Sequence, residues 1–199
     1  MLTPRPYLSF SQMALFERSP ELYADHYIYG KKQRISRNIA YGSLLAEGLE
    51  HDEATGDPLL DLMAAKLPKF ELMDKPVEAY LGDGRGVIHL LAKPDSAKAD
   101  YSAFFEYKTS TRRWTQRMAD ESGQITFYAT VIWLKTGKIP QDIELVEVEV
   151  AYGDGGKLAP TGTIVRLPTE RTVADIVKMT ARMRRAWHGI IALCKKELL

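Results

Sequence analysis

Two carboxylates and a lysine fall close together in the segment KPDSAKADYSAFFEYKTS, residues 93–110. Asp95 lies at the end of one predicted strand, and Glu106 and Lys108 lie two residues apart in the next. Successive side chains of a strand point to opposite faces, so Glu106 and Lys108 share a face. A hairpin between the strands would bring Asp95 close to Glu106. Two carboxylates at short range repel, which raises a proton affinity or demands a cation.

Magnesium suits such a site, because it keeps several waters and takes one or two carboxylates together with phosphate oxygens. The ion would polarise a phosphodiester and help to generate hydroxide, and Lys108 could hold the attacking water. The alternative is an exposed ion pair of Glu106 and Lys108, worth about a few tenths of a kcal/mol. The metal site is favoured because the chain has one Pro-Asp dipeptide and one acid-x-Lys triplet, in that order on neighbouring predicted strands.

The periodicity of apolar residues predicts an α/β protein with a mixed sheet and flanking helices. In chain order, we expect a helix capped near Ser9 or Ser11, a short helix after Pro20, helices at 39–51 and 58–67, strands at 76–81, 86–93 and 102–108, a helix from about 115 to 135, strands at 146–152 and 162–167, and a helix at 172–194.

Three of these elements carry more detailed expectations. In strand 102–108, Phe105 and Tyr107 would face a helix layer, which leaves Glu106 and Lys108 on the more open face. Strand 146–152, VEVEVAY, alternates strictly and is expected to have one wet face. The last helix is expected to place one apolar stripe on the core, made of Val173, Ile176, Val177, Met183, Trp187 and Ile190.

The spacing PD(x10)EYK resembles the PD-(D/E)xK phosphodiesterase superfamily. The next predicted helix carries GQITFY, in which Gln124 and Tyr128 stand one turn apart, and this resembles the Gln-xxx-Tyr motif of the RecB-like nuclease branch, which includes phage proteins. The opening SFSQMALFERSPELYADHYIYG also resembles that branch, so the resemblance covers roughly residues 7–152.

The resemblance implies a restriction-endonuclease-like core of order αβββαβ, with a central mixed sheet, extra N-terminal helices and a C-terminal helix. It also implies that Asp95 and Glu106 hold Mg²⁺ or Mn²⁺, that Lys108 positions and activates water, and that Gln124 orients the substrate. Tyr128 would form part of the wall of the DNA-binding cleft.

One position departs from the pattern of the branch. The branch has Gly-xxx-His on a helix before the sheet, and the matching segment YGSLLAEGLEH has Gly42 but carries Ala46 where the histidine is expected. Alanine ligates nothing, so another group must complete the metal shell or the site is weakened. Glu50, one helical turn later, and Glu47, the immediate neighbour, are the candidates, because carboxylates suit magnesium or manganese. The alternative for both is a solvated helix face.

Arginines follow the acid-x-Lys strand directly. Arg112 and Arg113 stand beside Trp114, with hydroxyl residues interleaved. A loop of this composition at the mouth of a metal site suits a phosphate backbone and stacked bases, so we expect these three residues to bind DNA.

Composition excludes several other classes. The chain has 199 residues, 45% of them hydrophobic and 27% charged, which suits a single globular domain spanning 1–199. The one cysteine, Cys194, excludes an internal disulfide and a cysteine-ligated iron–sulfur cluster. A net charge of +1 means that DNA must be met by local basic patches. No signal peptide or membrane-spanning run is apparent, so no membrane partner is expected and a cytoplasmic protein is the default.

Taken together, the residues and the resemblance predict a metal-dependent deoxyribonuclease. We expect it to act as an exonuclease in phage or prophage recombination or DNA processing. Its partner would be single- or double-stranded DNA. Because no GxxxxGK[ST] motif is present, unwinding would require a partner helicase or recombination protein, and an oligomer could add processivity. The competing hypothesis is a nucleic-acid-binding or assembly module that kept the fold and lost turnover, which Ala46 favours.

Overall fold

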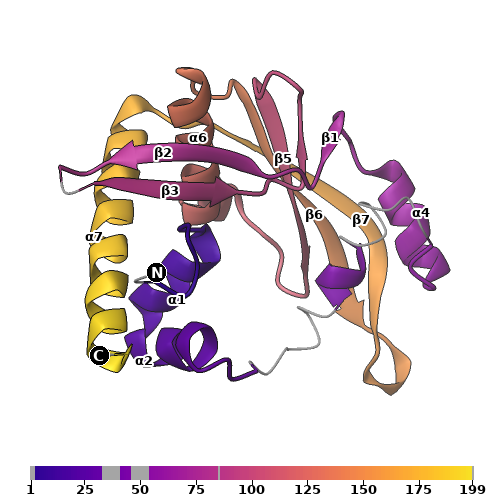
Figure 1. Ribbon diagram of the computed structural model, residues 1–199. Helices are drawn as coiled ribbons and strands as arrows, with labels where there is room; N and C mark the ends of the chain where they lie inside the picture. The colour runs from indigo at the N-terminus through magenta and orange to yellow at the C-terminus, as the bar shows by residue number, and fades with distance from the viewer. Residues whose placement is uncertain (1–2, 33–40, 46–53, 85, 199) are drawn as a thin grey trace.

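Alternating apolar residues build a mixed five-stranded sheet at the centre of the molecule (Figure 1). The computed structural model describes residues 3–32, 41–45, 54–84 and 86–198. The strand order is β1-β4-β5-β6-β7; β5 and β6 are parallel, and the other neighbours are antiparallel. The strands are β1 (Leu72–Met73), β4 (Ser96–Ala97), β5 (Ala103–Ser110), β6 (Asp142–Tyr152) and β7 (Leu158–Thr169). The α/β class with a central mixed sheet and flanking helices is confirmed.

The helices begin where the sequence supplies caps. Ser9 Oγ accepts a hydrogen bond from the Gln12 amide at 3.4 Å, which starts α1, and Asp57 caps α4 in the same way. The helical elements are α1 (Phe10–Arg18), α2 (Pro20–Tyr23), the π-helix η1 (Ala24–Ile28), α4 (Pro58–Lys66), α5 (Gln116–Asp120), α6 (Gly123–Thr136), the 3₁₀ turn η2 (Asp154–Gly156) and α7 (Val173–Leu198). Within the described ranges, no helix is both long and apolar enough to cross a membrane.

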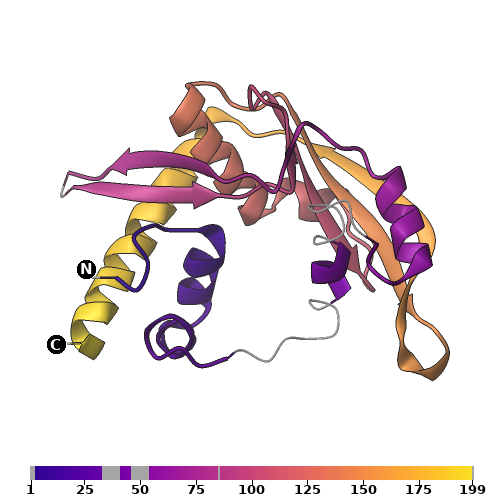
Figure 2. The same cartoon turned by 45° about the vertical axis from the view of Figure 1, so that its right-hand side comes forward.

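Helices cover both faces of the central sheet. On one face, Phe104 of β5 packs edge-on against Tyr128 of α6. On the other face, Phe105 joins a separate core cluster with Leu60 and Met63 of α4. α4 and α7 therefore lie at opposite sides of the molecule (Figures 1 and 2). The expectation that Phe105 faces a helix layer is confirmed.

The first two long strands do not join this sheet. β2 (Val77–Gly82) and β3 (Val87–Ala92) form a two-stranded sheet of their own, and β2 packs on α6 (Figure 1). A bridge from Leu8 to Leu90 lays the N-terminal segment along β3. The antiparallel partner of β5 is the two-residue β4, which follows Asp95 and is too short to give a periodic signal.

The long helix expected at 115–135 is two helices. Ser122 has an extended backbone, and its Oγ accepts a hydrogen bond from the Ile125 amide at 3.4 Å, which starts α6 anew after α5. Its end was placed correctly, since Gly137 closes the helix in the left-handed conformation at φ 76°. The break matters because it puts Gln124 in the first turn of α6.

Two expectations about faces were wrong. Val173 and Val177 of α7 are 65% and 60% exposed, because they lie to one side of the helix face that buries Ile176, Met179 and Met183. β6 also lacks a uniformly wet face: Glu147 is completely buried beneath the segment that follows β5.

Of the helix expected at 39–51, residues 41–45 are helical and the remainder lies outside the described residues.

A glycine sets how closely α1 and α7 pack. A Cβ placed on Gly189 of α7 would lie 2.5 Å from the Phe16 ring, which itself packs edge-on against Tyr23. Gly189→Ala is therefore expected to lower the free energy of unfolding by about 1–3 kcal/mol, although alanine normally favours a helix. Urea unfolding measures the change. In the Gly189→Ala/Phe16→Leu double variant the loss should be smaller than the sum of the single effects; simple additivity would show that Phe16 is not the obstacle.

Candidate metal centre between β5 and α6

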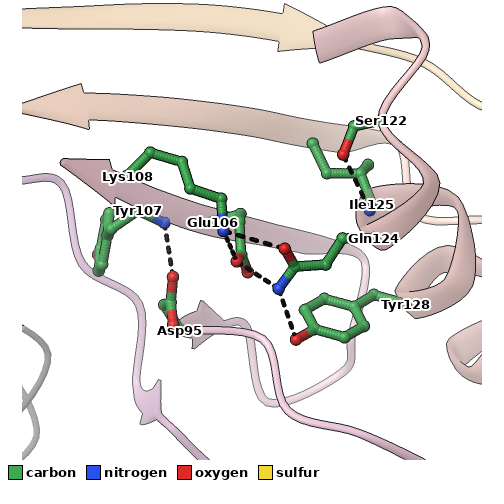
Figure 3. Close-up of polar contacts among 8 residues, drawn as sticks. All are labelled: Asp95, Glu106, Tyr107, Lys108, Ser122, Gln124, Ile125 and Tyr128. Atoms are coloured by element: carbon green, nitrogen blue, oxygen red, sulfur yellow. Dashed lines mark hydrogen bonds and ion pairs between the residues drawn. The ribbon is translucent and has the colours of Figure 1, made fainter. Parts of the chain in front are cut away.

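A tight reversal of the chain brings Asp95 to Glu106. β4 follows Asp95 and runs antiparallel to β5, with Ser96 opposite Phe105. The backbone amide of Tyr107 donates a hydrogen bond to Asp95 Oδ2 at 2.6 Å (Figure 3). The carboxylate is thus held by the backbone of the strand that carries Glu106. The structure thus brings the two acidic residues of the predicted site next to each other, at the backbone of β5.

Lys108 and Gln124 close the site from β5 and α6. Glu106 Oε1 accepts hydrogen bonds from Lys108 Nζ at 2.5 Å and from Gln124 Nε2 at 2.6 Å (Figure 3). Lys108 Nζ also donates to Gln124 Oε1 at 3.0 Å, and Gln124 Nε2 donates to the Tyr128 hydroxyl at 2.9 Å. Gln124 therefore bridges the acid and the base, and Tyr128 holds Gln124 from the next turn.

Glu106 does not lie on an open face, contrary to the sequence-based expectation. Its exposed fraction is 2%, because α6 covers this side of β5, whereas Asp95 and Lys108 remain partly accessible. Within the described part of the chain, Glu106 Oε2 has no hydrogen-bond partner. A buried carboxylate oxygen without a partner costs free energy unless a proton or a cation meets it.

Burial raises the pKa of both carboxyls, and the negative charge of Glu106 raises the pKa of Asp95 further. Lys108 opposes both shifts. For Lys108 itself, burial lowers the pKa, but the charges of Glu106 and Asp95 outweigh burial and the net pKa is raised. Asp74, in the turn before β2, adds a further negative charge that raises the pKa of both carboxyls. The site therefore has a strong affinity for positive charge.

These donors fit a hard divalent cation. Asp95 and the unpartnered Glu106 Oε2 supply the oxygen ligands that Mg²⁺ or Mn²⁺ takes, with water in the remaining positions. Among the residues that the structure describes, no group of three or more His, Cys, Asp or Glu side chains could hold a metal ion. The predicted further ligands Glu47 and Glu50, and Ala46 itself, lie outside the described residues.

The glycine of the N-terminal motif has a steric reason. A Cβ on Gly42 would lie 2.9 Å from Thr109 Oγ1, so the helical residues 41–45 pack directly on the end of β5. Thr109 follows Lys108 in the chain. Glycine is thus required where this helix crosses the strand that carries the site.

The predicted DNA-binding residues occupy different environments. Arg112 and Arg113 are exposed in the segment after β5, and Trp114 is half-buried. Tyr128 is buried at 8% exposure, and its hydroxyl is held by Gln124, so its place is beneath Gln124. Contact of these four residues with DNA stays a prediction.

Sequence reasoning missed a second buried carboxylate on this face. Glu147 of β6 is in register with Lys108 of β5, and its Oε2 accepts a hydrogen bond from the Trp114 amide at 2.9 Å. Burial raises its pKa, and within the described residues its Oε1 has no hydrogen-bond partner. Glu147 anchors the segment that presents Arg112 and Arg113. Its position in an alternating strand gave no sign of burial.

Sequence reasoning also missed Arg171, which fixes the start of α6. The buried guanidinium donates to Thr126 Oγ1 at 2.7 Å, to the Ala119 carbonyl at 2.9 Å and to the Ser122 carbonyl at 3.3 Å. It thereby joins the end of α5 to the first turn of α6, where Gln124 lies. A lone arginine between a strand and a helix carries no sequence signal for this role.

Comparison with solved structures shows the same fold in two other proteins. One, from Eubacterium rectale, is described as a candidate exonuclease; it is 12% identical, has a TM-score of 0.57, and aligns over 98% of this chain and 83% of its own. The other, a phage-related exonuclease from Haemophilus somnus 129PT, is 12% identical with a TM-score of 0.50, over 94% of this chain and 83% of its own. No protein-family model and no curated protein matches the sequence.

The raised pKa of Asp95 predicts a pH-dependent effect of Asp95→Asn in the metal-free protein. From about pH 4 up to the raised folded-state pKa, the folded chain binds a proton more tightly than the unfolded chain does, so the stability of the native protein falls as the pH rises. Asparagine avoids this loss and can still accept the Tyr107 hydrogen bond. The variant should therefore have the higher melting temperature near neutral pH in EDTA, with the difference shrinking toward pH 4. A difference independent of pH would contradict the shift.

Proposed function

We propose that this protein is a metal-dependent DNA nuclease of the RecB-like PD-(D/E)xK type, acting as an exonuclease. The observation that carries the proposal is the meeting of Asp95, Lys108 and Gln124 at the buried carboxylate of Glu106, which has one unpartnered oxygen within the described residues. Four residues from three separate segments meet with the chemistry that phosphodiester hydrolysis requires. A solvated ion pair would need neither burial nor Gln124.

Each residue has a distinct task in this proposal. Asp95 and Glu106 would hold Mg²⁺ or Mn²⁺, which when bound supplies a Lewis acid for the phosphodiester and lowers the pKa of water. Lys108 holds the attacking water, because its ammonium is partly accessible and already points toward Glu106. Gln124 keeps Lys108 and Glu106 in a fixed relation, and Tyr128 restrains Gln124.

The structural neighbours support the reaction class. Of the proteins that share the fold, the one from Eubacterium rectale is described as a candidate exonuclease and the one from Haemophilus somnus as a phage-related exonuclease. We extend that activity to this chain on the strength of its own site residues, and we propose a role in phage or prophage recombination or DNA processing. A helicase or recombination protein would then act as its partner, and Glu47 or Glu50 would complete the metal shell.

A second candidate function is a DNA-binding or assembly module without turnover. Alanine at position 46, where the RecB-like branch has a metal-binding histidine, is the observation that favours it. The cost of burying Glu106 argues for the nuclease, because a binding module has no use for a carboxylate oxygen that lacks a partner.

Removal of Lys108 should abolish cleavage while the fold is kept. Lys108→Met preserves the length of the side chain but cannot hold water or neutralise Glu106, so degradation of linear DNA with Mg²⁺ or Mn²⁺ should fall by at least about a hundredfold. Lys138→Met, at an exposed lysine after α6, is the matched control and should cleave as the native chain does. Cleavage measured on end-labelled single- and double-stranded DNA also distinguishes exonuclease from endonuclease action.

The outcomes separate the two candidate functions. Equal cleavage by native, Lys108→Met and Asp95→Ala chains would assign the activity to a contaminant and end the nuclease proposal. DNA binding by a native chain that cleaves with neither metal would favour the binding module.

Metal binding has a signature that does not depend on turnover. A divalent cation that binds the folded chain alone should stabilise it by about 2.7 kcal/mol at a hundred times its dissociation constant. Mn²⁺ is therefore expected to raise the melting temperature of the native protein and to have a much smaller effect on Asp95→Asn, whose carboxylate ligand is gone. Equal shifts in both proteins would place the ion elsewhere.

A further inference from the structure

Aromatic rings line the surface where the N-terminal segment crosses the β2–β3 sheet. Leu8 bridges Leu90 in parallel, and both side chains are fully buried. The adjoining residues Tyr7 and His89 therefore point to the outer face, where their ring centroids lie 6.1 Å apart at 77°. Tyr80, opposite His89 in the β2–β3 register, stacks on that imidazole with centroids 5.1 Å apart at 22°. Tyr80 is 64% exposed.

An arginine continues this row onto the helices. Arg5 donates a hydrogen bond to the Tyr7 hydroxyl at 2.9 Å, and its guanidinium lies 5.8 Å from the centre of the Tyr27 ring. Tyr27 in turn packs edge-on against His26, with centroids 4.6 Å apart. The aromatic stripe is this chain of contacts, formed in order by Tyr80, His89, Tyr7, Arg5, Tyr27 and His26.

A pocket opens at the end of the stripe formed by Tyr7, Arg5 and Tyr27. A surface pocket of about 390 Å³ is lined by Pro4, Arg5, Pro6, Tyr7, His26 and Tyr27. Two prolines restrict the backbone of this wall, so the rings are held in place without a helix or strand beneath each of them. Ordered rings lose little conformational entropy when a flat ligand stacks on them.

The charges of the stripe favour an anion. The described contacts of the Arg5 guanidinium are with the Tyr7 hydroxyl and the Tyr27 ring rather than with a carboxylate. Two carboxylates lie nearby: Lys31 Nζ pairs with Asp25 at 2.6 Å, and His89 Nε2 lies 3.0 Å from Glu78 and neutralises that charge only as an imidazolium. A strand of phosphates would therefore meet the cation of Arg5, while its bases meet the rings.

We infer that the aromatic stripe binds single-stranded DNA by base stacking. This inference rests on the proposed nuclease function and names the substrate strand for it. Aromatic faces beside a basic group bind unpaired bases. Each stacked base contributes about 1–3 kcal/mol to the binding free energy, and any base sequence is accepted. Tyr80 offers such an aromatic face, whereas the Tyr27 ring already packs against Tyr23, with centroids 4.9 Å apart, and against the Arg5 guanidinium. Bases within a duplex are stacked on one another and offer no face to Tyr80. The hydroxyls, imidazoles and guanidinium of the stripe also suit a hydrated polyanion better than an apolar protein surface.

The position of the stripe agrees with this role. His89 and Asp95 are six residues apart along the chain, which an extended segment spans in at most about 20 Å. This separation is within the length of a few nucleotides of one DNA strand. The stripe would hold the strand during cleavage and would so supply a grip on the substrate beyond the candidate site itself.

Oligothymidylate binding tests the inference. In EDTA, where no cleavage occurs, fluorescence anisotropy of a labelled oligothymidylate should show affinity weakened by roughly five- to a hundredfold in Tyr80→Ala. Tyr80→Trp keeps a stacking face and should bind at least as tightly as the native chain. Tyr152→Ala, at an exposed tyrosine of β6 outside the stripe, is the matched control and should bind normally.

Three further readouts distinguish stacking from a structural role. Arg5→Gln should reduce the dependence of log affinity on log salt by about one unit, as expected for one lost phosphate contact. A bromodeoxyuridine oligonucleotide should crosslink to the native chain at Tyr80, and a blunt duplex should compete poorly for the stripe.

The outcomes separate this inference from the proposed function. Cleavage of DNA by the native chain together with unaltered oligothymidylate binding in Tyr80→Ala would overturn the stripe and leave the nuclease standing. Stripe-dependent binding without cleavage in either metal would support the stripe and remove the nuclease. A native chain that binds no oligothymidylate overturns the inference outright.

Discussion

The burial of the Glu106 carboxylate is the constraint on which the candidate site depends. A charge withdrawn from water in this way destabilises the fold unless other groups compensate it. Lys108 and Gln124 compensate one oxygen, and within the described residues the other oxygen has no partner. The fold therefore holds a strongly attractive position for a cation at the point where Asp95 also arrives, which links the stability of the protein to what the site binds.

That burial is possible because several segments are fixed around β5. β4 reverses the chain so that the Tyr107 amide can hold Asp95, and α6 covers the face on which Glu106 lies. Arg171 ties the end of α5 to the first turn of α6, so Gln124 meets Lys108 at hydrogen-bond distance. β5 and α6, which carry Glu106, Lys108 and Gln124, are a strand and a helix rather than long loops, and such elements hold side chains in a fixed geometry more accurately.

The same architecture relates the site to the surface around it. β3 leads from the outer face that carries His89 into the turn at Asp95, and β5 leads from Lys108 into the segment with Arg112 and Arg113. Glu147 anchors that second segment through the Trp114 amide. The two surfaces that are proposed to meet nucleic acid thus both connect to the candidate site along strands, an arrangement that would suit a polymer substrate.

Local patterns were enough to predict the α/β class, most helix ends and the residues that meet in the candidate site, because periodicity, caps and an acid-x-Lys spacing are local properties. Which face of each strand is buried depends on the tertiary structure. Glu106 and Glu147 were expected to be wet, since alternation shows that two faces differ but not which neighbour covers each. β4 is two residues long and Arg171 stands alone, so neither could give a pattern, although one joins Asp95 to Glu106 and the other positions Gln124. Contacts between distant segments carry no periodic signal, and the site is made of such contacts.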